Sequence, residues 1–262
     1  MNIRFFKMHG TGNDFLMIEN WAKNIRLGTE TIALLCDRHF GIGADGLILI
    51  EKSDSADFQM KYYNSDGKEG SMCGNGGRCS IAFAANLGLI KNETTFLAAD
   101  GLHKGEIAGG KNPVWMVKLK MSDIDLPVEN KKGFVLNTGS PHLVVFCDDN
   151  SKTDVFALGR KIRFSNDFRE TGINVNFVTV QSDHIHVRTY ERGVEQETLS
   201  CGTGVTASAI VSAMQFPQFD NRVNIQTKGG NLSVEFVKVK DKITNVWLEG
   251  PATLVFSGEI QI

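Results

Sequence analysis

The alternation of apolar and polar positions predicts a chain built mainly from short β-strands. Residues 232–240 alternate strictly, a turn follows at Asp241, and residues 243–248 alternate again, which is the pattern of a β-hairpin. Other short apolar runs are also typical of strands and are distributed along the whole chain. They cover residues 47–51, 58–63, 114–120, 143–146, 175–180 and 184–190.

Helices are predicted at three places. Thr29 is placed to cap a helix whose apolar residues have helical spacing and which Gly41 ends. Residues 80–85 and 207–213 are small and apolar almost all round, which is typical of helices buried on every side. Many short hairpin strands with few helices favour an antiparallel α+β fold over a doubly wound sheet.

Glycine-rich clusters repeat at a nearly constant offset. The chain has 27 glycines in 262 residues, about 10% against a usual ~7%. The motif Cys73-Gly74-Asn75-Gly76 is matched 128 residues later by Cys201-Gly202-Thr203-Gly204. Weaker pairs keep the same order at offsets of 127 and 131 residues and begin at Thr11 and Thr138 and at Gly41 and Gly172. The shared order and spacing predict two similar halves that arose by duplication.

Charge and targeting signals narrow the class of protein. The 28 Lys and Arg against 30 Asp and Glu leave a formal charge of −2, whereas nucleic-acid binders usually carry a basic excess. Apolar runs such as residues 47–50 are far shorter than the roughly 20 residues that a membrane helix needs. The first residues show no secretory or transit character. We therefore expect a cytoplasmic protein that binds neither nucleic acid nor membrane.

Two of the five cysteines lie where reactive thiols are expected. The chain has no Cys-x-x-Cys pair, so neither a disulfide framework nor a structural zinc site is predicted. Cys73 and Cys201 each lie in a Gly-rich turn at the predicted start of a buried helix, where unpaired N–H groups and the helix dipole favour the thiolate. Two such thiols in equivalent places suggest an acid and a base, which suits inversion of a stereocentre.

Other motifs lack the context that their chemistry requires. The glycines of 41–46 have dinucleotide spacing, but a helix is predicted before them and a strand after them, the reverse of a dinucleotide site. His184 and His186 share one face of a strand without a third metal ligand nearby. Ser140 and His142 come without the Gly-x-Ser-x-Gly elbow of a hydrolase. No metal site is predicted.

The motifs together resemble those of the diaminopimelate epimerase family over nearly the whole length. The cysteine motifs are the most specific part of this resemblance. The matching segments are 7–15, 41–46, 63–67, 72–79, Pro141-His142, Asn174, Glu191-Arg192-Gly193 and 201–204.

The resemblance implies a fold and a reaction. The fold is α+β, with two pseudo-symmetric domains, each an antiparallel β-barrel around a central helix, and the active site in the cleft between them. The N-terminal half would cover residues 1–117, with 251–262 returning to it, and the C-terminal half 118–250. The reaction is the cofactor-independent interconversion of LL- and meso-diaminopimelate in lysine and peptidoglycan precursor synthesis. The sequence does not decide between a monomer and a homodimer.

The resemblance also assigns roles to single residues. Cys73 and Cys201 would be the catalytic acid–base pair, and His142 and Glu191 would tune their protonation. The distal amino-acid group of the substrate would lie near Asn13, Asn64, Asn174, Glu191 and Arg192. The carboxylate at the reacting carbon would bind backbone donors of Gly74, Asn75, Gly202 and Thr203.

Departures from the family and rival functions remain at this stage. Ser140 stands where many members have Asn, and Gly46 stands where some have Gln, which leaves substrate contacts at these two positions open. Proline and hydroxyproline racemases share the two-cysteine logic but usually have His where Asn75 stands. An amino-acid-binding module with structural thiols and a thiol oxidoreductase are alternatives from other classes.

Overall fold

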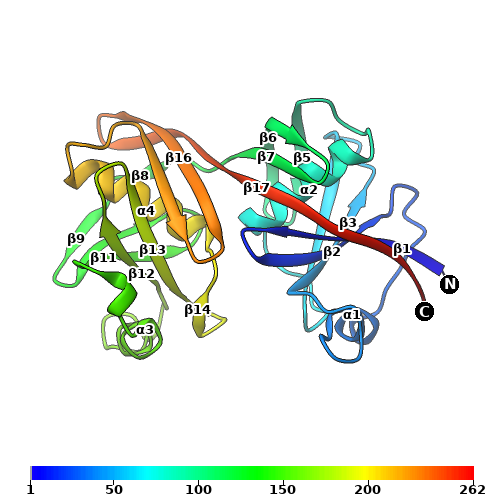
Figure 1. Ribbon diagram of the computed structural model, residues 1–262, viewed down its shortest axis with the longest axis horizontal. Helices are drawn as coiled ribbons and strands as arrows, with labels where there is room; N and C mark the ends of the chain where they lie inside the picture. Colours follow the sequence, from blue (N-terminus) through cyan, green and yellow to red (C-terminus); the bar gives the residue numbers. More distant parts are fainter. Residues whose placement is uncertain (1) are drawn as a thin grey trace. The chain divides into compact units, whose positions relative to one another are not determined.

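The computed structural model describes residues 2–262 of the chain. The chain forms two compact units. One consists of the part up to Leu119 together with Gly250–Ile262, and the other of Lys120–Glu249. Both units have parts of strand β17 (Lys242–Gln261), the red strand in Figure 1.

Eight strands of the first unit pair in a closed cycle. Each of β1 to β7 pairs with the next, and the last part of β17 pairs with both β7 and β1. The β2–β3 and β4–β5 pairs are parallel and the others are antiparallel. The seven strands before β17 are β1 (Asn2–Gly10), β2 (Asn13–Glu19), β3 (Gly46–Glu51), β4 (Phe58–Asn64), β5 (Glu93–Ala98), β6 (Gly101–Lys111) and β7 (Val114–Lys120).

The second unit repeats this pairing scheme. Its β11–β12 and β13–β15 pairs are parallel, at the places equivalent to those in the first unit. The first part of β17 pairs with β16 and β8, while β9 pairs with β10, so that β8 and β9 together supply the closing strand. The strands are β8 (Ile124–Asp125), β9 (Val128–Asn130), β10 (Gly133–Asn137), β11 (Pro141–Phe146), β12 (Asn174–Val180), β13 (His184–Glu191), β14 (Gln196–Thr198), β15 (Arg222–Thr227) and β16 (Gly230–Val239).

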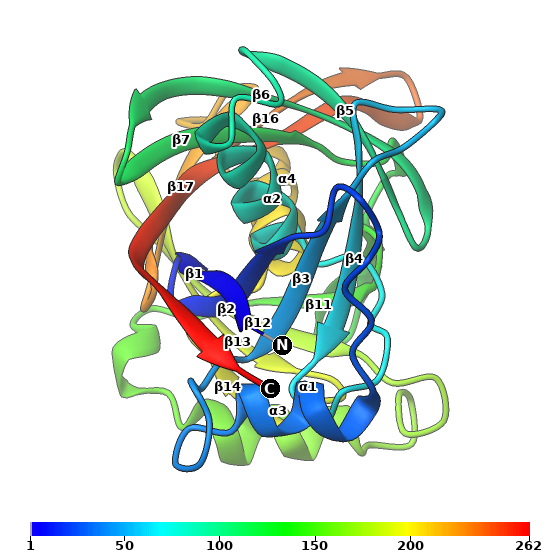
Figure 2. The same ribbon diagram turned by 90° about the vertical axis from the view of Figure 1, so that its right-hand side faces the viewer.

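A buried helix fills the middle of each barrel. Helix α2 (Gly74–Asn86) lies among the strands of the first unit, as Figure 2 shows, and α4 (Gly202–Gln215) takes the equivalent place in the second. Residues 75–84 of α2 are buried on every face. The small residues of both helices allow the surrounding strands to approach closely at the density of a protein interior. The prediction of two helices that are buried all round is confirmed.

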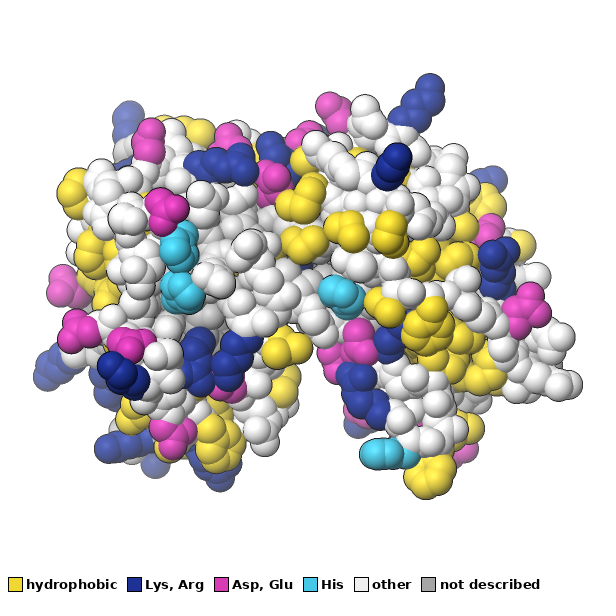
Figure 3. All heavy atoms as spheres, in the orientation of Figure 1, with side chains coloured by type: hydrophobic (Ala, Val, Ile, Leu, Met, Phe, Trp, Pro, Cys, Tyr) yellow, Lys and Arg dark blue, Asp and Glu magenta, His cyan; other side chains and the backbone are white. Residues whose placement is uncertain are grey.

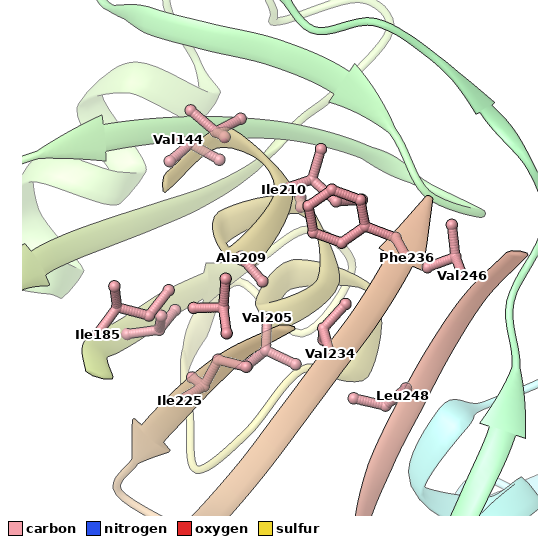
Figure 4. Packing of buried hydrophobic residues seen from close by; sticks show 14 of the residues in the cluster. Val144, Ile185, Val205, Ala209, Ile210, Ile225, Val234, Phe236, Val246 and Leu248 are labelled. Carbon is pink, nitrogen blue, oxygen red and sulfur yellow. The ribbon is translucent and has the colours of Figure 1, made fainter. Parts of the chain in front are cut away.

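The core of the second unit shows how α4 is held. Val205, Ala209 and Ile210 of the helix pack against apolar side chains from the strands that surround it (Figure 4). Each fully buried side chain of this size contributes roughly 1.5–3 kcal/mol by leaving water. The labelled strand residues of this cluster are Val144, Ile185, Ile225, Val234, Phe236, Val246 and Leu248.

Two shorter helices pack on the outside of the strands. Helix α1 (Thr29–Cys36) contacts β3, and α3 (Val155–Arg163) contacts β12, β13 and β14. The predicted cap at Thr29 is wrong, because Gly28 is the N-cap and makes no side-chain hydrogen bond to the helix. The sequence analysis did not predict α3. A 3-10 turn, η1 (Asn150–Lys152), precedes it.

Candidate active site

Both cysteine turns begin a central helix in the same conformation. Cys73 is the N-cap of α2 and Cys201 the N-cap of α4, with φ −116° at both and ψ of 125° and 113°. Neither helix has a side-chain cap, so the N–H groups of its first turn have no partner within the helix and point at the positive end of the helix dipole. Each turn is therefore suited to bind a carboxylate or a thiolate.

An asparagine of β2 contacts the thiol of Cys73. The Asn13 Nδ2 donates to Asp45 Oδ2 at 2.7 Å, which fixes the orientation of the amide. The Asn13 Oδ1 therefore faces the turn, where it accepts hydrogen bonds from Cys73 Sγ at 3.5 Å and from Asn75 Nδ2 at 3.2 Å. The first unit thus brings together three of the predicted site residues, Asn13, Cys73 and Asn75.

A charged cluster supports Asn13 from below. Asp14 forms ion pairs with Lys7 at 2.7 Å and with Arg38 at 2.8 Å, and Arg38 also pairs with Asp45 at 2.8 Å. Burial acts to raise the pKa of Asp14, but hydrogen bonds and charges from Arg38 and Lys7 outweigh it and hold this pKa well below its usual range. The carboxylate that orients Asn13 is therefore part of a permanently ionised network.

Glu191 and Thr203 are the polar neighbours of Cys201. The Cys201 thiol is 8% exposed, contacts Thr203 Oγ1 at 3.5 Å and forms a hydrogen bond with Glu191. The Glu191 Oε2 also accepts from Thr198 Oγ1 at 3.0 Å. Burial raises the pKa of Glu191, and the hydrogen bonds with Thr198 and Cys201 oppose this rise.

His142 is held by hydrogen bonds on both ring nitrogens. The Asn176 Nδ2 donates to Leu143 O and lies 3.1 Å from His142 Nδ1, while Asn176 Oδ1 accepts from Thr189. Because this amide is fixed, Nδ1 is an acceptor and the ring proton is on Nε2. The Nε2 group lies 2.9 Å from Thr203 Oγ1, which leaves the Thr203 hydroxyl able to donate to Cys201.

The buried imidazole of His142 gives a pH dependence of stability. Burial, aided by the charge of Arg192, lowers its pKa from 6.5 to about 3, against the effect of Asn176. The unfolded chain therefore binds a proton between pH 6.5 and 3 that the folded chain excludes, so stability is lost as the pH falls below 6.5. We expect a loss of roughly 1.4 kcal/mol per pH unit from this residue.

Unfolding by urea at pH 6.5 and pH 5 measures this contribution. The difference in unfolding free energy between the two pH values should be smaller by roughly 2 kcal/mol in His142→Gln than in the unmodified chain. An equal difference in the two proteins would contradict a neutral buried imidazole.

The remaining predicted contacts are distributed unevenly over the two units. Asn174 donates to Ser140 Oγ at 2.9 Å and accepts from the backbone N–H of Arg192 at 2.8 Å, so these residues gather around His142. The Arg192 guanidinium donates to Thr171 O at 2.9 Å. Asn64 is exposed at the end of β4.

The sequence analysis missed four residues that the site uses. Asn176 could have been found, because it shares one face of β12 with Asn174. Thr198, Asp45 and Arg78 had no signal of this kind, since their contacts depend on the tertiary fold.

Other candidate groups are not part of these turns. Burial raises the pKa of Cys36 to about 11 and that of Cys79 to about 12, so both remain protonated thiols. The rings of His184 and His186 lie 4.9 Å apart, and residues 2–262 contain no group of three side chains suited to hold a metal ion. Helix α1 precedes the glycines of 41–46 and β3 follows them, which confirms the context that argued against dinucleotide binding.

Comparison with known proteins identifies relatives over the full length of the chain. The model of a protein family described as diaminopimelate epimerase matches residues 5–123 and 134–255. The diaminopimelate epimerase of Flavobacterium psychrophilum is 48% identical over 260 residues, which cover 98% of this chain and 100% of the relative. The diaminopimelate epimerase of Aquifex aeolicus is 40% identical over 275 residues, which cover 98% of each chain.

Solved structures with low sequence identity share the fold. A Bacillus anthracis phenazine biosynthesis protein of the PhzF family superposes with a TM-score of 0.73 at 16% identity and full coverage of both chains. A hydroxyproline epimerase from Agrobacterium vitis gives a TM-score of 0.67 at 13% identity and covers 99% of this chain and 92% of that one. These likenesses confirm the expected fold class, with two parallel pairs added to each barrel.

Proposed function

Because the chain belongs to the diaminopimelate epimerase family, it is an isomerase, and we propose that Cys73 and Cys201 are the two acid–base groups with which it interconverts LL- and meso-diaminopimelate. This reaction belongs to lysine and peptidoglycan precursor synthesis. The observation that carries the assignment is the pair of cysteines that cap equivalent buried helices in the same conformation. Each compact unit supplies one of the two thiols.

The proposed reaction moves only protons. One cysteine, as thiolate, removes the hydrogen from the α-carbon, and the electron pair of the C–H bond passes into the adjacent carboxylate group. Backbone N–H groups of Gly74, Asn75, Gly202 and Thr203 stabilise the charge that develops there. The other cysteine, as thiol, returns a proton to the opposite face of the carbon. The two sulfurs have then exchanged protonation states, and no cofactor is required.

The surroundings of each sulfur suit both of its protonation states. The Asn13 Oδ1 accepts from a Cys73 thiol, whereas the Thr203 hydroxyl can donate to a Cys201 thiolate. Glu191 contacts Cys201 directly, and His142 acts on it through Thr203. The titrations of the two thiols are expected to be coupled, because one proton is shared between them in each direction.

Proton exchange with solvent tests this function against a binding module. In D2O, the enzyme is expected to place deuterium at the α-carbon while it converts LL- to meso-diaminopimelate. A protein that only binds the amino acid would leave the α-hydrogen in place. Exchange with proline or hydroxyproline but not with diaminopimelate would favour the racemase alternative.

Recognition of the distal group gives a prediction for Arg192. We propose that Asn13, Asn64, Asn174, Glu191 and Arg192 bind the distal amino and carboxylate groups. Loss of a charge-assisted hydrogen bond costs roughly 1.5–3 kcal/mol. Arg192→Ala should therefore raise KM for diaminopimelate by roughly 10- to 100-fold in steady-state assays.

Arg169→Ala is the matched control, because Arg169 is an exposed arginine of the same unit. Its KM should stay within about two-fold of that of the unmodified enzyme, since exposed substitutions are usually nearly neutral. An unchanged KM in Arg192→Ala would remove this residue from the substrate site.

We further propose that the enzyme acts in the cytoplasm on this small molecule alone, without nucleic acid or membrane. The formal charge is −2, and acidic and basic side chains are interspersed on the face shown in Figure 3. No helix in residues 2–262 combines the length and apolarity needed to cross a bilayer. Whether the enzyme works as a homodimer is a separate question that light scattering of the purified protein answers directly.

A further inference from the structure

Arg78 is a fully buried cation on the central helix of the first unit. Its side chain is 0% exposed and is the largest fully buried one in residues 2–262. Its Nη2 donates to Asn75 Oδ1 at 2.9 Å and to Thr11 Oγ1 at 3.3 Å, and its Nη1 lies 3.5 Å from Gly74 O. The Nε group has no hydrogen-bond partner. Every partner of this guanidinium is a neutral group.

The ionisable neighbours of Arg78 are thiols. Within residues 2–262, no ion pair of Arg78 with a carboxylate is found, and the charges that act on it are those of Cys79 and Cys73. Burial lowers the pKa of Arg78, but an arginine remains protonated in proteins. Cys79 is itself fully buried and stays a neutral thiol. The turn at Cys73 is therefore the place where a compensating negative charge can form.

The second unit shows that the helix does not need this charge to fold. Thr206, 128 residues later, takes the equivalent position in α4, and its Oγ1 donates to Gly202 O at 2.9 Å. It thereby makes the neutral counterpart of the contact between Arg78 and Gly74. A buried charge without a partner is strongly unfavourable, so its presence in only one of two equivalent helices indicates a role specific to Cys73.

We propose that Arg78 is a positioning residue that stabilises the thiolate of Cys73 and orients Asn75 beside it. The guanidinium supplies a fixed positive charge in a site of low dielectric, where its effect on a nearby anion is large. Its hydrogen bond to Asn75 Oδ1 turns Asn75 Nδ2 toward Asn13. The proposal rests on the proposed function in so far as the Cys73 thiolate is the catalytic base.

Alkylation by iodoacetamide, followed by peptide mapping, tests the charge without any epimerase assay. The ratio of the alkylation rates of Cys73 and Cys201 is measured in the same molecules, so that Cys201 serves as an internal reference. Arg78→Gln keeps a hydrogen-bond donor but loses the charge, and it should lower this ratio at least roughly ten-fold. Arg78→Lys keeps the charge and should hold the ratio within about three-fold.

Arg78→Met supplies a second arm that removes both the charge and the hydrogen bonds. It should lower the alkylation ratio as Arg78→Gln does, while its thermal unfolding midpoint is no lower, because a buried charge has been replaced by an apolar side chain. An unchanged ratio in Arg78→Gln, or an equal fall at both cysteines, would overturn the proposal. If the unmodified enzyme failed to epimerise diaminopimelate while the ratio responded as expected, the proposed function alone would fail.

Discussion

Alanine at Cys73 or at Cys201 is expected to abolish epimerisation, whereas alanine at Cys147 leaves it intact. Each of the two thiols supplies one proton transfer, and a positioned acid or base contributes roughly 10²–10⁴-fold to a rate. We therefore expect each single variant to lose at least about 10³-fold in kcat. Chiral chromatography of the LL and meso isomers measures the loss.

Cys147 is the matched control because it lies in neither turn. It follows β11, and its Sγ contacts Val178 O at 3.6 Å. Normal activity in Cys73→Ala would show that this thiol is not a catalytic group. Partial hydrogen exchange without epimerisation in one of the two variants would instead support the pair, because the remaining thiolate can still remove a proton from one isomer.

Gly204→Ala is expected to be far more damaging than Gly76→Ala, although the two glycines are equivalent in the repeat. A Cβ at Gly204 would lie 2.4 Å from Asn176 Oδ1 and 3.3 Å from His142 Cε1, both held by buried hydrogen bonds. A Cβ at Gly76 would meet only the ends of Ile48 and Met60, at 3.1 Å, and these flexible side chains can move. The first turn of α4 must therefore shift in Gly204→Ala.

A misplacement of about 1 Å at a reacting group can cost 10²-fold in rate, and we expect a loss of that size in Gly204→Ala. Gly76→Ala should stay within a few-fold of the unmodified enzyme, since alanine also favours the helix. Measurements of kcat and of the unfolding midpoint for both variants decide the matter. Equal effects at the two positions would mean that Asn176 and His142 yield more easily than their hydrogen bonds indicate.

The elements that the sequence predicted well are those whose pattern is local. Residues 232–240 and 243–248 form the predicted hairpin of β16 and β17, and the small-residue runs form the centres of α2 and α4. Helix α3 escaped notice because it is only partly buried: Phe156 and Leu158 are exposed, and the close approach to Tyr190 is made by Gly159. Gly250 and Pro251 are typical strand breakers, yet β17 continues through them.

The cysteine turns of the site could be predicted, but their surroundings could not. A cysteine before a glycine-rich helix start is a local signal, and it indicated both turns correctly. The contact of Asn13 with Cys73 spans 60 residues, and that of His142 with Thr203 spans 61. Parallel pairing of β11 with β12 places His142 opposite Asn174. No periodicity in the sequence specifies such a pairing.

The way in which the two barrels close has a consequence for folding during synthesis. The strand that completes the second barrel, β8 with β9, lies directly ahead of the other strands of that unit in the chain. The first barrel instead waits for residues 250–261, which the ribosome makes last. Nascent chains usually fold from the N-terminus onward. Here we expect the C-terminal half to mature first, while the N-terminal half keeps an open edge that chaperones must guard until translation ends.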